Sequence, residues 1–311
     1  MAALICGSLA YDTVMVYPGR FRDQILPDKI HLLNVSFMVP TLRRYFGGCA
    51  GNIAYNLKLL ESDGHAMGAV GHDFGPYRDW MIANGMSLKF VRVIKEEYTA
   101  QAYITTDLDA NQLTAFHPGA MNHSWRIEVP ADGSITIGVL APDGRQGMIA
   151  HAAQFARAKI PFIFDPGQAM TLFDGAELKT FVEQASWVTV NDYEAELLQE
   201  RTGYSKGELA ARAKAYVVTQ GAQGSVIHAG GRRVEIPAVQ AVAVVDPTGC
   251  GDAYRAGILY GLMHGIDWET TGRIASLMGA IKIATVGTQH HRFTMNEFRE
   301  RFHDTFQYRL D

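Results

Sequence analysis

The stretch AVAVVDPTGCGDAYRAG, residues 241–257, decides how the rest of the chain is interpreted. The apolar, β-branched run Gln240–Val245 predicts a buried strand. The glycines that follow predict a tight turn, and an amphipathic helix is expected to open at Asp252. Because glycines leave the backbone amides of residues 249–251 uncovered, and the positive end of the helix dipole lies beside them, this turn is suited to bind an anion.

A carboxylate beside such an anion site indicates proton transfer. Asp252 would take a proton from a substrate hydroxyl, while the amides of three residues hold the phosphoryl group that the hydroxyl attacks. Asp252 also fits a simple helix cap, because Asp is favoured there. Cys250 has no base beside it in sequence, so its amide is expected to matter more than its thiol. The predicted amide donors are Gly249, Cys250 and Gly251.

A second glycine-rich stretch reads RYFGGCAGNIAYNL at residues 44–57. Gly47 and Gly48 allow a ligand to approach the backbone closely. Apolar residues at helical spacing follow, so a helix with one buried face is expected. Asn52 lies at its start, where its amide could offer a donor and an acceptor to vicinal hydroxyls or could cap the helix.

Together, the two stretches resemble the signatures of the PfkB, or ribokinase-like, carbohydrate kinases. The string Asp-Pro-Thr-Gly-x-Gly-Asp at 246–252 is similar to the C-terminal signature, and Gly47-Gly48 to the N-terminal one. Weaker matches follow the order of the family along the chain, and several are similar to bacterial adenosine kinases and nucleoside kinases. These matches lie at residues 21–46, 71–80, 115–121 and 165–168. The resemblance implies an ATP-dependent kinase that phosphorylates the 5′-hydroxyl of purine ribonucleosides, namely adenosine and also inosine and guanosine.

The resemblance also implies roles for individual residues. Asp12 would accept hydrogen bonds from sugar hydroxyls, and Glu194 would act on Mg²⁺ through water. Asp246 and Thr248, with backbone carbonyls around Lys282 and Gly287, would hold a monovalent cation, with K⁺ as an activator. The implied substrate-binding residues are Ser8, Asp12, Ser36, Phe37, Gly48, Asn52, Phe116, Met121 and Gln168. The implied ATP-binding residues are Asn191, Thr219, Gly221, Gly224 and Gly251.

Several of these residues also fit a structural role. Asn191 and Glu194 have the spacing of a helix capping box, and residues 219–224 fit an ordinary hairpin. The aromatic side chains could stack on a base or pack within a lid. Arg255, one helical turn after Asp252, fits either phosphate neutralisation or a surface ion pair. Ala102 stands where related adenosine kinases carry a phenylalanine, which is expected to loosen base selection.

The fold is predicted from the alternation of elements. Beyond about residue 130, short β-rich runs alternate with helical stretches, which predicts a doubly wound α/β sheet with helices on both faces within a single domain, 1–311. Two zones without helices, at about 13–46 and 97–117, predict an inserted small β-sheet lid. The predicted strands are Ile135–Leu140, Ile160–Phe164, Trp187–Val190, Tyr216–Thr219, Ser225–His228 and Gln240–Val245. The predicted helices include Gly175–Gln184, Tyr193–Glu200, Ala253–His264, Asp267–Thr285 and Thr294–Phe306.

Composition limits the classes of partner. The chain has 311 residues and a net charge of −4, which gives no basic footprint for nucleic acid. No apolar run reaches the roughly 18 residues of a membrane span, so a cytoplasmic protein is expected. The 3 cysteines are far apart and form no metal-binding pair. The expected partners are a small nucleoside and ATP, with a homodimer formed through the lid.

Two other functions stay open at this point. A kinase of a free sugar such as ribose would share every catalytic residue named above. A nucleoside-sensing protein without catalysis would keep the fold, although the intact Asp252 and its glycine turn argue against it.

Overall fold

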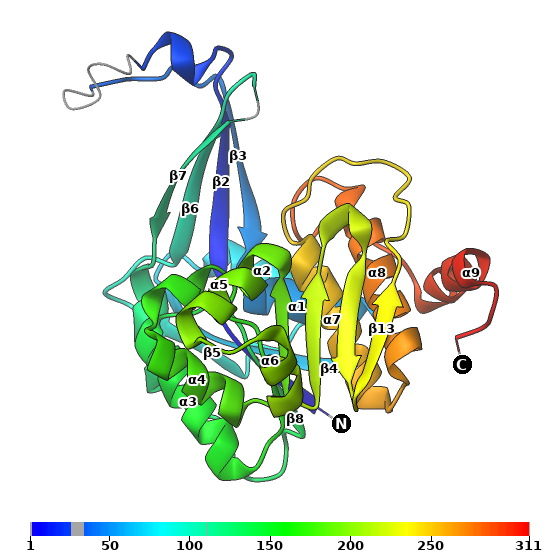
Figure 1. The fold of residues 1–311 in the computed structure, drawn as a ribbon. Helices are drawn as coiled ribbons and strands as arrows, with labels where there is room; N and C mark the ends of the chain where they lie inside the picture. The colour runs from blue at the N-terminus through cyan, green and yellow to red at the C-terminus, as the bar shows by residue number, and fades with distance from the viewer. Residues whose placement is uncertain (1, 26–33, 110, 311) are drawn as a thin grey trace.

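A computed structural model describes residues 2–25, 34–109 and 111–310 and arranges them as two β-sheets with surrounding helices (Figure 1). The strands of the large sheet are β1 (Ala2–Cys6), β4 (Asp63–Gly71), β5 (Phe90–Ile94), β8 (Ile137–Leu140), β9 (Phe162–Phe164), β10 (Trp187–Asn191), β11 (Ala215–Thr219), β12 (Ser225–Ala229) and β13 (Arg232–Ile236). Their order is β13-β12-β11-β10-β9-β8-β1-β4-β5, parallel except at β12 and β13.

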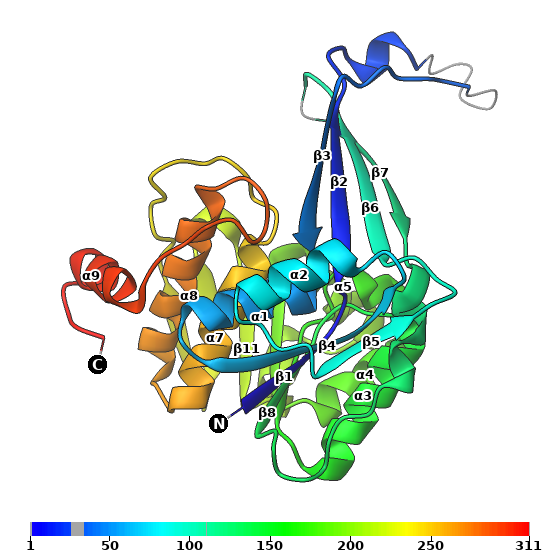
Figure 2. The same cartoon turned by 180° about the vertical axis from the view of Figure 1, so that it is seen from behind.

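Helices cover both faces of this sheet, as the alternation of elements predicted. The α-helices are α1 (Cys49–Leu59), α2 (Gly75–Ala83), α3 (Arg145–Ala158), α4 (Gly175–Gln184), α5 (Asp192–Thr202), α6 (Lys206–Arg212), α7 (Cys250–His264), α8 (Trp268–Ile283) and α9 (Met295–Phe306). Helices α3 to α6 lie over the face seen in Figure 1, and α1, α2, α7 and α8 lie over the face seen in Figure 2.

The central strand β1 packs against a hydrophobic core on each face of the sheet. Ala3 and Ile5 belong to the core beneath α1, α7 and α8, whereas Leu4 and Cys6 belong to the core beneath α3 and α4. Successive side chains of a strand point to opposite faces, so a strand buried on both faces must be apolar throughout. The carboxyl ends of the parallel strands then converge on one edge, where such sheets bind ligands.

One predicted strand is wrong. Gln240–Val245 forms an exposed loop, in which the Val242 side chain is 94% exposed. The edge strand is instead β13, which pairs with β12 across Gly230 and Gly231, both at positive φ. β-Branched composition favoured the run at 240–245, whereas the Gly-Gly turn at 230–231, which follows a predicted strand, is a hairpin signal that the prediction did not use.

The small sheet confirms the β-rich insertions. Its strands are β2 (Ala10–Val16), β3 (Thr41–Gly47), β6 (Ala100–Thr106) and β7 (Gln112–His117), in the order β3-β2-β6-β7. It stands out from the edge of the large sheet in both views, so its position fits a lid (Figures 1 and 2). The part of the predicted lid at 26–33 lies outside the described residues. Among the described helices, none is long and apolar enough to cross a membrane.

Candidate active site

The predicted anion site lies where α7 begins. Its N-cap is Gly249, whose φ of 80° belongs to the left-handed region that favours glycine, and no side chain caps the helix. A Cβ at Gly249 would approach Thr288 to 3.0 Å, so the segment after α8 also requires glycine here. The predicted set of amide donors needs a correction, because the Cys250 amide already donates to the carbonyl of Pro247 at 3.1 Å. Gly249 and Gly251 keep amides for an anion.

Asp252 lies beside these amides as the third residue of α7, so it is not the helix cap that its residue type allowed. Its Oδ2 accepts a hydrogen bond of 2.8 Å from Nδ2 of Asn52. Burial raises the pKa of Asp252 to about 6, against the opposing effect of the bond from Asn52. A carboxylate with a pKa just below neutrality is ionised at neutral pH and still suited to accept a proton.

Asn52 is held in turn by a hydrogen-bond chain that the sequence did not reveal. Its Oδ1 accepts from Nε2 of Gln289 at 3.0 Å, and Oε1 of Gln289 accepts from the indole N–H of Trp80 at 3.1 Å. Because an indole N–H is a donor only, Trp80 fixes which end of the Gln289 amide faces it, and Gln289 then fixes the amide of Asn52. Asn52 is therefore not a helix cap, and one of its donors is committed to Asp252 rather than to a sugar hydroxyl.

Asp12 approaches the same site from β2. A Cβ on Gly47 would come within 2.3 Å of the Asp12 carboxylate, and one on Gly48 within 2.5 Å of the carbonyl of Ser8, so glycine is required at both positions. Burial, with the negative charges of Asp252 and Asp246, raises the pKa of Asp12 to about 7. Ser8 supports this turn, since its Oγ accepts from the amide of Cys49 at 3.1 Å.

The register of the small sheet extends the site outward along the lid. Asp12 pairs with Ala102, and Ala102 pairs with Phe116, so these three side chains lie in a row on one face. The Phe116 side chain is 51% exposed, which leaves its ring free to contact a ligand. Val14, Arg43 and Tyr45 share this face and line a cavity of ≈ 440 Å³ with Asp246 and Thr248.

Other residues implied for substrate binding lie elsewhere. The Phe37 ring packs against Tyr17 and Phe21, with centroids 4.9 and 5.0 Å away, in an aromatic cluster at the outer end of the lid. Of its two possible roles, lid packing is the one observed. Ser36 is exposed beside it. Met121 is buried at the base of the lid, packed against Ala10 and Ala100.

Gln168 has a different position. It lies exposed in the short helix η4 (Gly167–Leu172), which follows the carboxyl end of β9. Its location at the ligand-binding edge of the sheet keeps the predicted contact with a ribose hydroxyl or a base edge open.

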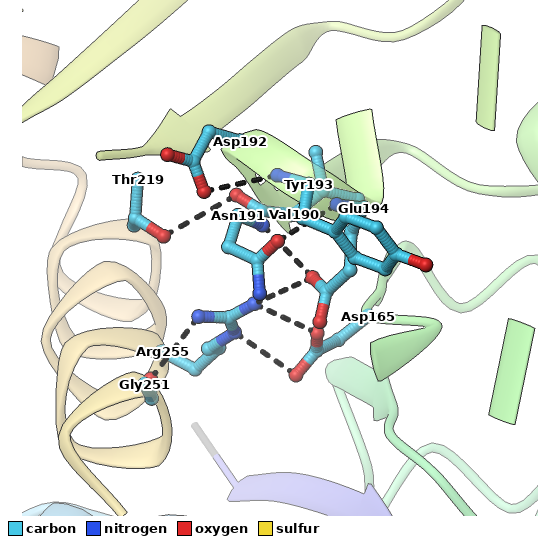
Figure 3. A network of polar contacts seen from close by, with 9 residues as sticks. All are labelled: Asp165, Val190, Asn191, Asp192, Tyr193, Glu194, Thr219, Gly251 and Arg255. Carbon is cyan, nitrogen blue, oxygen red and sulfur yellow. Dashed lines mark hydrogen bonds and ion pairs between the residues drawn. The ribbon is translucent and has the colours of Figure 1, made fainter. Parts of the chain in front are cut away.

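Figure 3 shows the Arg255 guanidinium directed at the carboxylates of Asp165 and Glu194, and its burial rules out the surface ion pair that was one of the two expectations for it. Its guanidinium donates to both carboxylate oxygens of Asp165, from Nε and Nη2, each at 3.0 Å. Nη2 also lies 3.7 Å from Oε2 of Glu194. Both partners of the ion pair are almost fully buried. Because Asp165 follows β9 and Glu194 lies just after β10, Arg255 links α7 to the ends of two strands. A guanidinium suits this position because it is planar and binds a carboxylate through two parallel bonds.

The residues implied for ATP lie at the ends of neighbouring strands. Asn191 ends β10 and pairs directly with Thr219 at the end of β11. Asn191 and Glu194 form the capping box, with bonds of 2.7 and 2.8 Å, and Glu194 stays close to the edge of the site. Burial and the charge of Asp165 raise the pKa of Glu194, while Arg255 opposes that shift. Gly221 and Gly224 bound the short helix η5 (Gly221–Gln223), which turns β11 into β12 and confirms the hairpin.

The region implied to hold a monovalent cation contains an ammonium group. Nζ of the fully buried Lys282 donates to the carbonyl of Asp246 at 2.7 Å and to that of Thr285 at 3.3 Å. The Asp246 carboxylate accepts from the amides of Thr248 and Gly287 at 2.9 and 2.8 Å. Burial lowers the pKa of Lys282, and the Asp246 carboxylate opposes that shift. The residues present therefore do not fit a metal cation at this point, because two of the expected ligands already bind Nζ.

A metal site elsewhere in the structure would need several His, Cys, Asp or Glu side chains close together. Within residues 2–25, 34–109 and 111–310, no three His, Cys, Asp or Glu side chains are grouped as a metal site. Mg²⁺ in kinases usually takes one or two carboxylates and completes its shell with substrate phosphates and water, so this observation is compatible with the role implied for Glu194. Burial raises the pKa of the Cys250 thiol to about 11, which is unsuited to a nucleophile or metal ligand.

Comparison with known proteins agrees with this geometry. Residues 9–294 match the family described as pfkB family carbohydrate kinase. A nucleoside kinase of Methanocaldococcus jannaschii is 30% identical over 270 residues, covering 86% of this chain and 89% of that protein. The structure of Burkholderia thailandensis nucleoside kinase in complex with inosine is 52% identical and covers 99% of each chain, with a TM-score of 0.91. The complex of that enzyme with ADP-inosine is 53% identical, covering 100% of this chain and 98% of the other, with a TM-score of 0.88. This chain belongs to the pfkB family of carbohydrate kinases, with the α/β fold and second small sheet of its ribokinase-like members.

Proposed function

We propose that this kinase transfers the γ-phosphoryl group of ATP to the 5′-hydroxyl of a purine ribonucleoside. The observation that carries the proposal is the position of Asp252, held by Asn52 beside the free amides of Gly249 and Gly251. One helical turn thus presents an acceptor for a hydroxyl proton and donors for a phosphoryl group. The relatives named as nucleoside kinases, one of them bound to inosine, support the substrate class.

Each group has a defined part in the transfer. Asp252 accepts the proton as the 5′-oxygen forms its bond to the γ-phosphorus. The bond from that phosphorus to the bridging oxygen breaks, and ADP leaves. The amides of Gly249 and Gly251, at the positive end of α7, stabilise the negative charge that develops on the phosphoryl oxygens. Mg²⁺ bound to the ATP phosphates would neutralise further charge, with Glu194 close enough to bind its water shell.

Ribose binding is assigned to the base of the lid. Asp12 accepts hydrogen bonds from ribose hydroxyls, and the absence of side chains at Gly47 and Gly48 lets the sugar reach the backbone. The raised pKa of Asp12 gives its carboxyl affinity for a nearby proton or hydroxyl donor. Asn52, committed to Asp252, has its second amide hydrogen left for the sugar.

Base binding is assigned to the row of side chains along the lid. Ala102 lies between Asp12 and Phe116 and leaves open space over the base, which Phe116 can cover from one side. Apolar contact does not distinguish an amino group from an oxo group at position 6 of a purine, and a pocket without a polar reader discriminates poorly. Adenosine, inosine and guanosine are therefore all expected substrates, and pyrimidine nucleosides, with a smaller ring to stack, are expected to be poorer.

The nucleotide would lie across the ends of β10 and β11 and along the turn to β12. Asn191 and Thr219 stand side by side there, and Gly221 and Gly224 leave the backbone of the turn accessible to a ligand. ATP in this position would direct its γ-phosphate toward Gly251. Activation by K⁺ stays a prediction of the resemblance, and the position of Lys282 argues against it.

The second face of the lid supports a homodimer formed through the small sheet. Leu42, Tyr103 and Leu113 lie on the face opposite Asp12 and are at least 39% exposed. A sheet with apolar side chains on both faces favours a partner on the face that the substrate does not use. Sedimentation of the wild type and of Leu42→Glu would test this, with a dimer expected for the first and a monomer for the second.

The decisive experiment is a panel of acceptors with ATP and Mg²⁺. Purine ribonucleosides, pyrimidine nucleosides, ribose and fructose 6-phosphate are compared by chromatographic detection of the phosphorylated product, with Asp252→Asn as the inactive control. Purine ribonucleosides are expected to give the highest kcat/KM. A preference for free ribose would replace the nucleoside assignment by the sugar-kinase alternative, and binding without turnover would favour the sensing protein.

A further inference from the structure

Lys282 is a charged residue whose side chain is completely buried. It lies in the last turn of α8, with 0% of its surface exposed. A buried lysine is costly unless its charge and its N–H donors are satisfied. Here Nζ donates to the carbonyls of Asp246 and Thr285 and lies 3.9 Å from the Asp246 carboxylate. The chain therefore places two carbonyl oxygens and one carboxylate oxygen around this nitrogen.

The atoms that surround Nζ belong to the loop that forms the anion site and to the segment after α8. Asp246 begins the Asp-Pro-Thr-Gly turn, and its amide and that of Val245 both donate to the carbonyl of Ile283, at 3.1 and 2.9 Å. Its carboxylate binds the amides of Thr248 and Gly287. The turn before α7 and the segment after α8 thus meet around a single positive charge, which Lys282 provides.

We propose that the ammonium group of Lys282 takes the structural place of a monovalent metal cation beneath the anion site, so that this kinase works without K⁺. Backbone carbonyls and a carboxylate form the kind of oxygen shell that binds K⁺. An ammonium is a compact point charge with donors for the same oxygen atoms. A metal ion placed among them would meet the ammonium at contact distance, and the like charges would repel each other.

The inference rests on the proposed kinase activity for one of its two readouts. The first is the rate of phosphorylation, followed by chromatography of the product so that no potassium-dependent coupling enzyme is present. The second is the midpoint of thermal unfolding, which needs no turnover. Both are measured in KCl, NH₄Cl and tetramethylammonium chloride at constant ionic strength.

Two variants separate the charge of Lys282 from its volume. Lys282→Ala removes the ammonium and leaves space for an ion, whereas Lys282→Met removes the charge and keeps the side chain in place. Lys95→Ala, at an exposed lysine after β5, is the matched control.

For the wild type and Lys95→Ala, the rate and the unfolding midpoint are expected to agree within about twofold and about 1 °C among the three salts. Lys282→Ala is expected to lose about ten- to a hundredfold in kcat/KM in tetramethylammonium, which corresponds to lost hydrogen bonds of a charged group. Added K⁺ or NH₄⁺ should then restore part of the rate and raise the unfolding midpoint in a saturable manner. Lys282→Met should lose activity without such rescue.

The proposal is overturned if K⁺ stimulates the wild type more than about fivefold or raises its unfolding midpoint saturably. It is also overturned if Lys282→Ala matches the wild type in tetramethylammonium. Where Lys282→Ala does not fold, the ion response of the wild type and the behaviour of Lys282→Met still decide. If no nucleoside is phosphorylated under any condition, the proposed function fails, while the unfolding measurements still test the role of Lys282.

Discussion

The orientation of Asn52 gives the sharpest test of the site, through the variant Gln289→Met. Methionine has nearly the shape of glutamine but neither donates to Asn52 nor accepts from Trp80. In the wild type, Nε2 of Gln289 faces Oδ1 of Asn52 at 3.0 Å, which directs Nδ2 of Asn52 toward Asp252 at 2.8 Å. A protonated Asp252 thus meets a donor where it needs an acceptor, so the chain from Trp80 disfavours the protonated form.

Without Gln289, the Asn52 amide can turn when Asp252 is protonated, and its Oδ1 can then accept a hydrogen bond from the carboxyl O–H. A hydrogen bond between neutral groups contributes about 0.5–1.5 kcal/mol, and 1.36 kcal/mol corresponds to one pH unit. The pKa of Asp252, raised by burial to about 6 in the wild type, is therefore expected to move up by about 0.5–1. Because the base must be ionised, kcat/KM of Gln289→Met should be about two- to fivefold lower at pH 6 and nearly unchanged at pH 8.

The assay is the pH dependence of kcat/KM between pH 5 and 9, with product measured by chromatography. Thr288→Val is the matched control, because it removes the neighbouring hydrogen bond from Thr288 to the carbonyl of Phe46 but leaves the chain to Asn52 intact. Its pH midpoint should equal that of the wild type. A uniform loss of rate in Gln289→Met at all pH values, with the midpoint unmoved, would refute the reasoning.

Three further outcomes are expected. Asp252→Asn should lower kcat by about 10²–10⁴ while nucleoside binding persists in calorimetry, and near-normal turnover would remove Asp252 from the mechanism. Its free energy of unfolding in urea at pH 8 should be about 1–2 kcal/mol higher than that of the wild type, because no ionised carboxylate is then buried. Ala102→Phe should narrow the range of bases, measured as the ratio of kcat/KM for adenosine to that for inosine, which in the wild type should lie within about two orders of magnitude; an unchanged ratio would show that Ala102 does not face the base. Arg255→Met should destabilise the protein by about 3–5 kcal/mol in urea, because Asp165 stays buried without its partner, and a loss below about 1 kcal/mol would contradict the buried pair.

The sequence was sufficient for those features that depend on local pattern. The helix at the Asp-Pro-Thr-Gly turn, the capping box at Asn191 and the hairpin at 219–224 follow from short-range rules and are present. The β-rich insertions were also predicted correctly as a second sheet. At 240–245, β-branched composition alone predicted a strand where the structure has an exposed loop.

The contacts that define the site could not be predicted in the same way, because they join distant parts of the chain. Gln289 and Asn52 are 237 positions apart, and Arg255 and Asp165 are 90 apart. No periodicity relates such pairs. Arg255 looked like an exposed residue near a phosphate site because its position one turn into a helix says nothing about what the opposite sheet edge presents. A charged residue within an apolar stretch of a helix, such as Lys282 in the stretch LMGAIKI at the end of α8, is the signal that could have indicated a distant partner.

The segment from the end of α8 to Gln289 connects the two halves of the chemistry. Its amide at Gly287 holds the Asp246 carboxylate beneath the anion site, at 2.8 Å, and Gln289 holds the amide of Asn52 against the base. Thr288, between them, binds the carbonyl of Phe46 at the base of the lid at 2.6 Å. Three consecutive residues therefore set the position of the phosphoryl-binding turn, the lid and the proton acceptor relative to one another. Because alignment of the reacting groups accounts for much of the rate in phosphoryl transfer, a displacement of this segment would impair turnover without removing any group that touches a substrate.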